Sequence, residues 1–240
     1  MLKQERAVRT LRSLIHSAAE TFLRHGYVQA KLAEISTGAG VSTGALHFHF
    51  ETKAALASTV QDAAAAILRT AARSAASQPG TNALQTLTNT SHVLADTLRD
   101  DVVARAGFQL SRDARCETEW DVCQEWREYV QRLLTQAADE GVLVEDAVPD
   151  DVAASIVATT TGLELLARDD AGWLSHTTLT DFWTLVLPAL ATPAALAVLE
   201  PAGTHSGGRD RTPPGGHGPV RRAQLTARRP GLSTRPVPIH

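Results

Sequence analysis

Apolar residues recur every three or four positions along most of the chain, and strand-type alternation is scarce. The first such stretch runs from Arg6 to Arg24 and predicts an amphipathic helix. His25-Gly26-Tyr27 ends this helix, and Gly26 suits the positive-φ position that commonly follows a helix. The apolar face of this helix comprises Leu11, Leu14, Ile15, Ala18, Ala19, Phe22 and Leu23. The pattern as a whole predicts an all-α fold.

Two short helices follow, at about 31–37 and 42–47, and Gly38-Ala39-Gly40 separates them. Ser42 can cap the second one. A longer Ala-rich helix starts at about Thr52 and runs to about Ala76, where Ser77-Gln78-Pro79-Gly80 ends it. Two short helices joined by a glycine turn and supported by a long first helix are typical of a helix-turn-helix. We expect its small core to hold Leu32, Ile35, Val41, Leu46, Phe48 and Phe50, together with Leu14, Ala18 and Phe22.

Further helices are predicted at about 83–99, 101–112, 119–140, 150–167, 179–190 and 193–199. Pro149 and Pro193 fit first-turn positions, whereas Pro188 should kink or end its helix. We therefore expect three parts. Residues 1–55 would form the helix-turn-helix domain and residues 56–200 a helical body. Residues 201–240 hold seven Pro, seven Gly and seven Arg, a composition that predicts a disordered basic tail.

Charge is unevenly distributed among these parts. The net charge is +3 over residues 1–55, −12 over 56–200 and +6 over 201–240. The basic charge of residues 1–55, next to an acidic body, favours a polyanionic partner for residues 1–55. The two cysteines, Cys116 and Cys123, are expected to stay reduced thiols. The charged N-terminal stretch has no apolar signal core, and no apolar run reaches membrane-spanning length. We expect a cytoplasmic protein without a membrane partner.

In a helix-turn-helix the second helix enters the major groove of double-stranded DNA, and its first residues face the bases. Gly44 would let the backbone approach the DNA, and Ala45 could press a methyl group against thymine. His47 and His49 do not share a helix face, and no Cys, Asp or Glu cluster completes a metal site near them. No catalytic set or cofactor loop is present, which predicts a non-enzyme without cofactor or metal. The expected DNA-binding residues are Lys31, Ser42, Thr43, Gly44, Ala45, His47, His49 and Lys53.

The stretches AAETFLRHGY and LAEISTGAGVSTGALHFHFETKAAL resemble the DNA-binding domain of TetR-family transcriptional regulators over about residues 8–57. The shared features are Gly26-Tyr27, the Ala39-Gly40-Val41 turn, the aromatic-x-His-Phe run ending at Phe50, and Lys53. More narrowly, GALHFHF resembles the GALYFHF of γ-butyrolactone autoregulator receptors of streptomycetes and their pseudo-receptor relatives. DVVARAGFQLSRD (101–113) and EWREYVQRLL (125–134) resemble segments of the same branch. Thr43 and His47 depart from it, because relatives carry lysine and tyrosine there.

The resemblance implies a homodimeric repressor whose body encloses a pocket for a small molecule, either a γ-butyrolactone or an antibiotic-like compound. By the same resemblance, Trp126 lines that pocket. A threonine of the apolar helix VAASIVATTTGLELLA could add a hydroxyl, and Thr160 and Thr161 are the candidates. The helices at 150–167 and 179–190 would pair with the same two helices of a second copy of the chain in a four-helix bundle. The alternative is an all-α small-molecule-binding or adaptor protein that has lost specific DNA binding, which the departures at Thr43 and His47 would explain.

Overall fold

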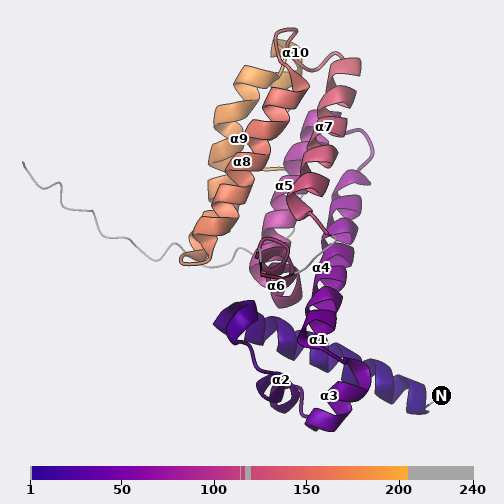
Figure 1. The fold of residues 1–240 in the computed structure, drawn as a ribbon. Coiled ribbons are helices and arrows are strands. Elements are labelled where there is room, and N and C mark those ends of the chain that lie inside the picture. Colours follow the sequence, from indigo (N-terminus) through magenta and orange to yellow (C-terminus); the bar gives the residue numbers. More distant parts are fainter. Residues whose placement is uncertain (1, 114, 117–119, 205–240) are drawn as a thin grey trace, which may run out of the picture. The chain divides into compact units, whose positions relative to one another are not determined.

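The computed structural model describes residues 2–113, 115–116 and 120–204, and its first four helices form the helix-turn-helix region. These are α1 (Leu2–Gln29), α2 (Leu32–Gly38), α3 (Thr43–His49) and α4 (Lys53–Ala76). Figure 1 shows α2 and α3 against α1, with α4 leading from α3 toward the remaining helices. Helix α1 is interrupted at Gly26, whose φ of 71° confirms the predicted positive-φ position.

The body consists of α5 (Ala83–Asp100), α6 (Val102–Leu110), α7 (Val122–Asp139), α8 (Pro149–Ala167), a 3₁₀ turn η1 (Ala171–Leu174), α9 (His176–Leu190) and α10 (Pro193–Leu196). The described residues contain no strand, only one isolated bridge between Leu143 and Ala191. The predicted all-α fold is confirmed. Both first-turn prolines are also confirmed. Pro188 lies inside α9, which ends two residues later at Leu190.

Three apolar clusters hold these helices together. One lies under the helix-turn-helix and joins α1, α2, α3 and the first half of α4. It also includes Ala106 and Leu110 of α6, so a body helix completes the core of the helix-turn-helix region. A second cluster, centred on the fully buried Trp183, joins α5, α7, α8 and α9. The third includes Leu68, Phe108 and Leu163 and borders the cavity described below.

Phe50 is buried at 5% exposure, but Phe48 is 86% exposed, so its predicted place in the core is wrong. The physical reason is helix geometry, because α3 continues to His49 and residues two positions apart cannot share one face. Leu46 and Phe50 are four positions apart and occupy the buried face. Phe48 therefore projects outward beside His47.

The end of the described chain is held on α5. Gln85 bonds both the N–H and the carbonyl of Glu200 at 2.8 and 3.1 Å, and Asn89 bonds both the N–H and the hydroxyl of Thr204. His92 Nε2 lies 2.9 Å from the carbonyl oxygen of Pro201. The first residues of the predicted tail, 201–204, are thus packed against the body. The rest of that tail, 205–240, lies outside the described residues.

Candidate functional site

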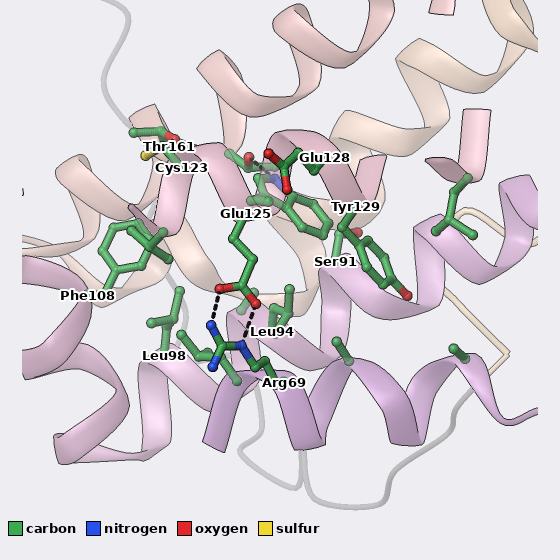
Figure 2. A pocket seen from close by; sticks show the side chains of 18 of the residues that line it. Arg69, Ser91, Leu94, Leu98, Phe108, Cys123, Glu125, Glu128, Tyr129 and Thr161 are labelled. Atoms are coloured by element: carbon green, nitrogen blue, oxygen red, sulfur yellow. Dashed lines mark hydrogen bonds and ion pairs between the residues drawn. The ribbon is translucent and has the colours of Figure 1, made fainter. Parts of the chain in front are cut away.

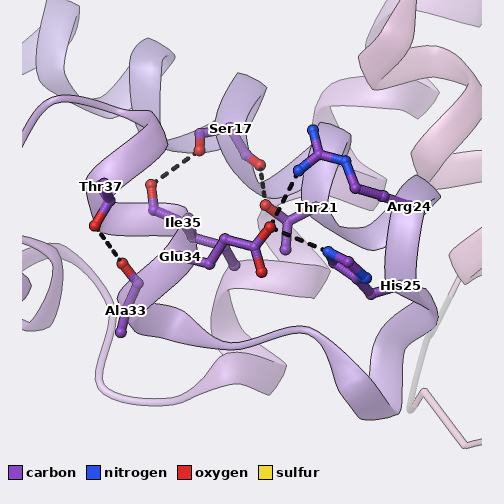
Figure 3. A network of polar contacts seen from close by, with 8 residues as sticks. All are labelled: Ser17, Thr21, Arg24, His25, Ala33, Glu34, Ile35 and Thr37. Carbon is purple, nitrogen blue, oxygen red and sulfur yellow. Dashed lines mark hydrogen bonds and ion pairs between the residues drawn. The ribbon is translucent and has the colours of Figure 1, made fainter.

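Side-chain bonds position α2 on α1 (Figure 3). Glu34 of α2 accepts a hydrogen bond from Arg24 at 3.1 Å, and His25 Nε2 lies at the same distance from that carboxylate oxygen. On the other side of α2, the Ser17 hydroxyl donates to the carbonyl of Ile35 at 2.9 Å. Because Ser17 is buried, this bond fixes the depth at which α2 sits against α1.

The turn between α2 and α3 depends on two glycines. Gly40 has a φ of +68°, a conformation that L side chains rarely adopt. A Cβ at Gly38 would come within 2.4 Å of the Ser17 hydroxyl, so a larger residue there would displace that hydroxyl from its bond to Ile35. Ser42 then caps α3, accepting the Ala45 N–H at 3.1 Å as predicted. The turn therefore sets the direction in which α3 leaves the domain.

The exposed face of α3 consists of Thr43, Gly44, His47 and Phe48. Ala45 and His49 are half-buried, and the His49 ring packs edge-on against Phe48 with centroids 5.4 Å apart. Among the residues that the structure describes, a Cβ at Gly44 would meet no atom nearer than 3.9 Å, so none of their contacts requires glycine there. Glycine in a helix costs about 1 kcal/mol relative to alanine. Gly44 therefore leaves the backbone in the first turn of α3 uncovered by the described side chains.

The two predicted lysines differ in their surroundings. Lys31 is exposed at the N-terminal end of α2, and its side chain makes no cap hydrogen bond. The Lys53 ammonium donates to the carbonyls of Val28 and Ala30 at 2.9 and 3.2 Å. It also lies 4.9 Å from the centroid of the Tyr27 ring. These contacts join the start of α4 to the end of α1, which favours a positioning role for Lys53 over a phosphate contact.

The body contains a cavity of about 610 Å³ between α4, α5, α7 and α8, with α6 contributing Phe108 (Figure 2). All three predicted ligand residues line it: Trp126, Thr160 and Thr161. Trp126 Nε1 donates to the Thr160 hydroxyl at 3.0 Å, and the indole stacks on Tyr129 with centroids 5.7 Å apart. One end of the wall is apolar, through Leu68, Leu94, Leu98, Phe108, Leu163, Leu174 and Leu179.

An ion pair on the cavity wall was not predicted from the sequence. Arg69 of α4 and Glu125 of α7 form two hydrogen bonds of 2.7 Å each, and Trp120 Nε1 donates to the same carboxylate at 2.8 Å. The bonds from Arg69 lower the pKa of Glu125, against the opposing effect of burial. The partners lie 56 positions apart, so no local spacing signalled them. The pair connects α4 to the helix that carries Trp126.

No group of three or more metal-ligating side chains occurs within the part of the chain that the structure describes. None of the described helices is long and apolar enough to cross a membrane.

Comparisons with known proteins agree with this geometry. Residues 14–60 match the model of the bacterial regulatory proteins of the TetR family. The A-factor receptor protein of Streptomyces griseus is 32% identical over 204 residues, which cover 85% of this chain and 71% of that protein. The chain belongs to the TetR family. A crystal structure of an ArpA-like gamma-butyrolactone receptor superposes with a TM-score of 0.70 at 26% identity, covering 79% of this chain and 92% of that one.

A third relative links the family to DNA. CprB from Streptomyces coelicolor, solved in complex with its biological operator sequence, has a TM-score of 0.67 and is 28% identical. The superposition covers 80% of this chain and 93% of CprB. The TetR-family helix-turn-helix and the γ-butyrolactone-receptor branch predicted from the sequence are thereby confirmed.

In this TetR-family chain, two helices connect the cavity to the helix-turn-helix. The first half of α4 packs in the helix-turn-helix core through Leu56 and Val60, and its second half lines the cavity through Leu68 and Arg69. Helix α6 does the same over one turn, with Leu110 in that core and Phe108 on the cavity wall. A change in the cavity that moves either helix would therefore also move the helix-turn-helix.

Proposed function

We propose that the chain is a ligand-responsive transcriptional repressor. It binds a near-palindromic operator as a homodimer, and a small signalling molecule entering the cavity releases it. The shared helix α4 is the observation that carries this proposal, because it belongs to both the helix-turn-helix core and the cavity wall. The relatives are gamma-butyrolactone receptors, which supports a γ-butyrolactone, or an antibiotic or its precursor, as the ligand and secondary metabolism as the regulated process.

The DNA contacts are proposed at two levels. Thr43, Gly44 and His47 on the exposed face of α3 would reach base edges. The half-buried methyl group of Ala45 would contact a thymine methyl group next to them. The other predicted residues would either contact phosphates or hold α3 in position against the DNA. They are Lys31, Ser42, His49 and Lys53. This DNA-binding role also supports a cytoplasmic location and a non-enzymatic function.

Dimerisation would use α8 and α9. Leu165 and Leu166 of α8 are 56% and 46% exposed, and Leu185 of α9 is 79% exposed. These exposed leucines are the apolar surface that pairing of two copies would cover. One helix-turn-helix reads only a few base pairs, so pairing two copies supplies both affinity and operator symmetry.

The test is fluorescence anisotropy with the full chain and DNA from upstream of its own gene, at several salt concentrations. We expect sequence-selective binding that weakens with salt, and release by either a γ-butyrolactone or a locally produced antibiotic. Equal binding to scrambled DNA would overturn the repressor function. It would favour the alternative, a helical small-molecule-binding protein, whose one structural argument is that α3 carries no Lys or Arg.

A further inference from the structure

The exposed face of α3 is unusual in its hydrogen-bond chemistry. The helix Thr43–His49 contains no lysine or arginine, so it has no side chain with a permanent cationic fork. Its outward groups are the Thr43 side chain, the bare backbone of Gly44, the His47 imidazole and the Phe48 ring, which is 86% exposed. Apolar surface thus makes up much of the face that would meet the bases.

The Thr43 hydroxyl is further restricted by Ser36 of α2. The buried Ser36 hydroxyl donates its proton to the carbonyl of Ala33 at 3.0 Å. Either oxygen could be the donor in the 3.3 Å contact between Ser36 and Thr43, and while Ser36 donates to Ala33 only the threonine can supply that proton. With that proton engaged, Thr43 presents only its methyl group and its hydroxyl lone pairs to a partner in the groove.

These groups fit one base pair better than the others. Guanine presents two acceptors, N7 and O6, which are matched by a two-donor side chain such as arginine or by lysine. A T·A pair presents the thymine methyl and the adenine amino donor. Thr43 offers a methyl and an acceptor, and Phe48 adds an exposed aromatic surface next to His47 on the same helix. The two ring nitrogens of His47 point in different directions, so the imidazole does not present two parallel N–H donors as arginine does.

We propose that α3 selects T·A pairs by apolar contact with thymine methyl groups and disfavours guanine, and that Ser36 is a positioning residue that holds Thr43 in its acceptor state. This inference rests on the proposed function, since a protein without specific DNA binding has no base to select. It goes beyond that function by naming the base pair that the helix recognises and the side chains that make the selection.

The experiment starts with selection of bound sequences from random double-stranded DNA by the full-length protein. We expect near-palindromes with T·A pairs at the positions that α3 contacts. The best site is then synthesised with deoxyuridine in place of each enriched thymidine, which removes only the methyl group. Loss of one buried methyl group should weaken binding about three- to fivefold at those positions.

Variants then separate the roles of the two hydroxyl groups. S36A frees the Thr43 proton and should raise binding to sites with guanine at the Thr43 position several-fold. T43V keeps the methyl group, replaces the hydroxyl with a second methyl, and should retain the thymidine-to-deoxyuridine difference, whereas T43K should shift selection toward guanine. T135V, an exposed threonine on α7, serves as the matched control and should leave base preference unchanged.

The outcomes are distinguishable. Selection of a defined operator with guanine at the α3 positions, and no effect of deoxyuridine, overturns the inference and leaves the repressor function standing. Selection of no sequence at all overturns both. An S36A variant with unchanged tolerance of guanine removes Ser36 from the proposal, even where the thymine methyl effect is present.

Discussion

Gly44 lies exposed in the first turn of α3, with nothing within 3.9 Å of where its Cβ would be. G44A should therefore stabilise the free protein by about 0.5–1 kcal/mol, because alanine is the better helix former. The same methyl group would stand between backbone and DNA, so we expect about tenfold weaker operator binding. Thermal unfolding and anisotropy measure the two effects. S74A on α4 is the control, expected to stabilise without weakening the operator complex, and equal operator affinity for G44A would contradict the close approach.

Lys31 and Lys53 can be separated by the salt dependence of binding. K31A removes an exposed charge at the N-terminal end of α2 and should lower the slope of log affinity against log salt by about one. K53M loses the bonds to Val28 and Ala30 and should destabilise the fold by about 1–3 kcal/mol. We expect its salt slope to stay unchanged once measured at a temperature where it is folded. A reduced slope for K53M would instead place its ammonium on a phosphate.

His92 makes stability depend on pH. Burial lowers its pKa below the ordinary value of 6.5, and nearby His176 acts in the same direction, while the Pro201 carbonyl and Asp96 oppose the shift. The folded state thus favours the neutral imidazole. Its contribution to stability is complete above pH 6.5 and is lost as pH falls through the lower folded pKa. Urea unfolding between pH 7.5 and pH 5 should show this decline, and H92Q, which retains a donor for Pro201, should flatten it. An unchanged profile in H92Q would assign the decline to other groups.

At the scale of elements, α6 packs tightly against α4 at Gly107. A Cβ there would lie 2.2 Å from the Cβ of Ala64 and 3.1 Å from the Val60 carbonyl oxygen. G107A should therefore push the two helices apart and destabilise the protein by about 1–3 kcal/mol. Because both helices join the cavity to the helix-turn-helix, ligand-induced release of DNA should also weaken. The measurements are thermal unfolding and a ligand titration of the operator complex.

A double-variant cycle provides the control for this contact. A64G removes the methyl group that the new Cβ would meet, so G107A should cost less in the A64G background than in the parent. Equal costs in the two backgrounds would show that the close packing of α6 on α4 is not the source of the instability.

Across the whole molecule, local patterns predicted the elements and the helix-turn-helix, because periodicity, caps and glycine turns are encoded by near neighbours. Gly26, Ser42 and Pro149 all lie where those rules placed them. The pocket was only partly predictable. Trp126 came from resemblance, whereas the Arg69–Glu125 pair joins residues far apart in sequence and became visible only when packing placed α4 beside α7. The prediction for Phe48 was wrong because the alternating aromatic residues suggested that Phe48 and Phe50 are both buried, whereas they point to opposite sides.

At the scale of the whole molecule, the proposed dimer pairs through α8 and α9. Leu185 is 79% exposed on α9, so aspartate at this position is tolerated in a monomer. In a dimer that buries α8 and α9, L185D would place an unpaired carboxylate in the interface, which is strongly unfavourable. We expect sedimentation to show monomers at micromolar concentration, with operator affinity reduced about a hundredfold or more through loss of the second half-site. A138D, an exposed position on α7, is the matched control and should stay dimeric. Dimers of L185D with full operator affinity would place the interface on another surface.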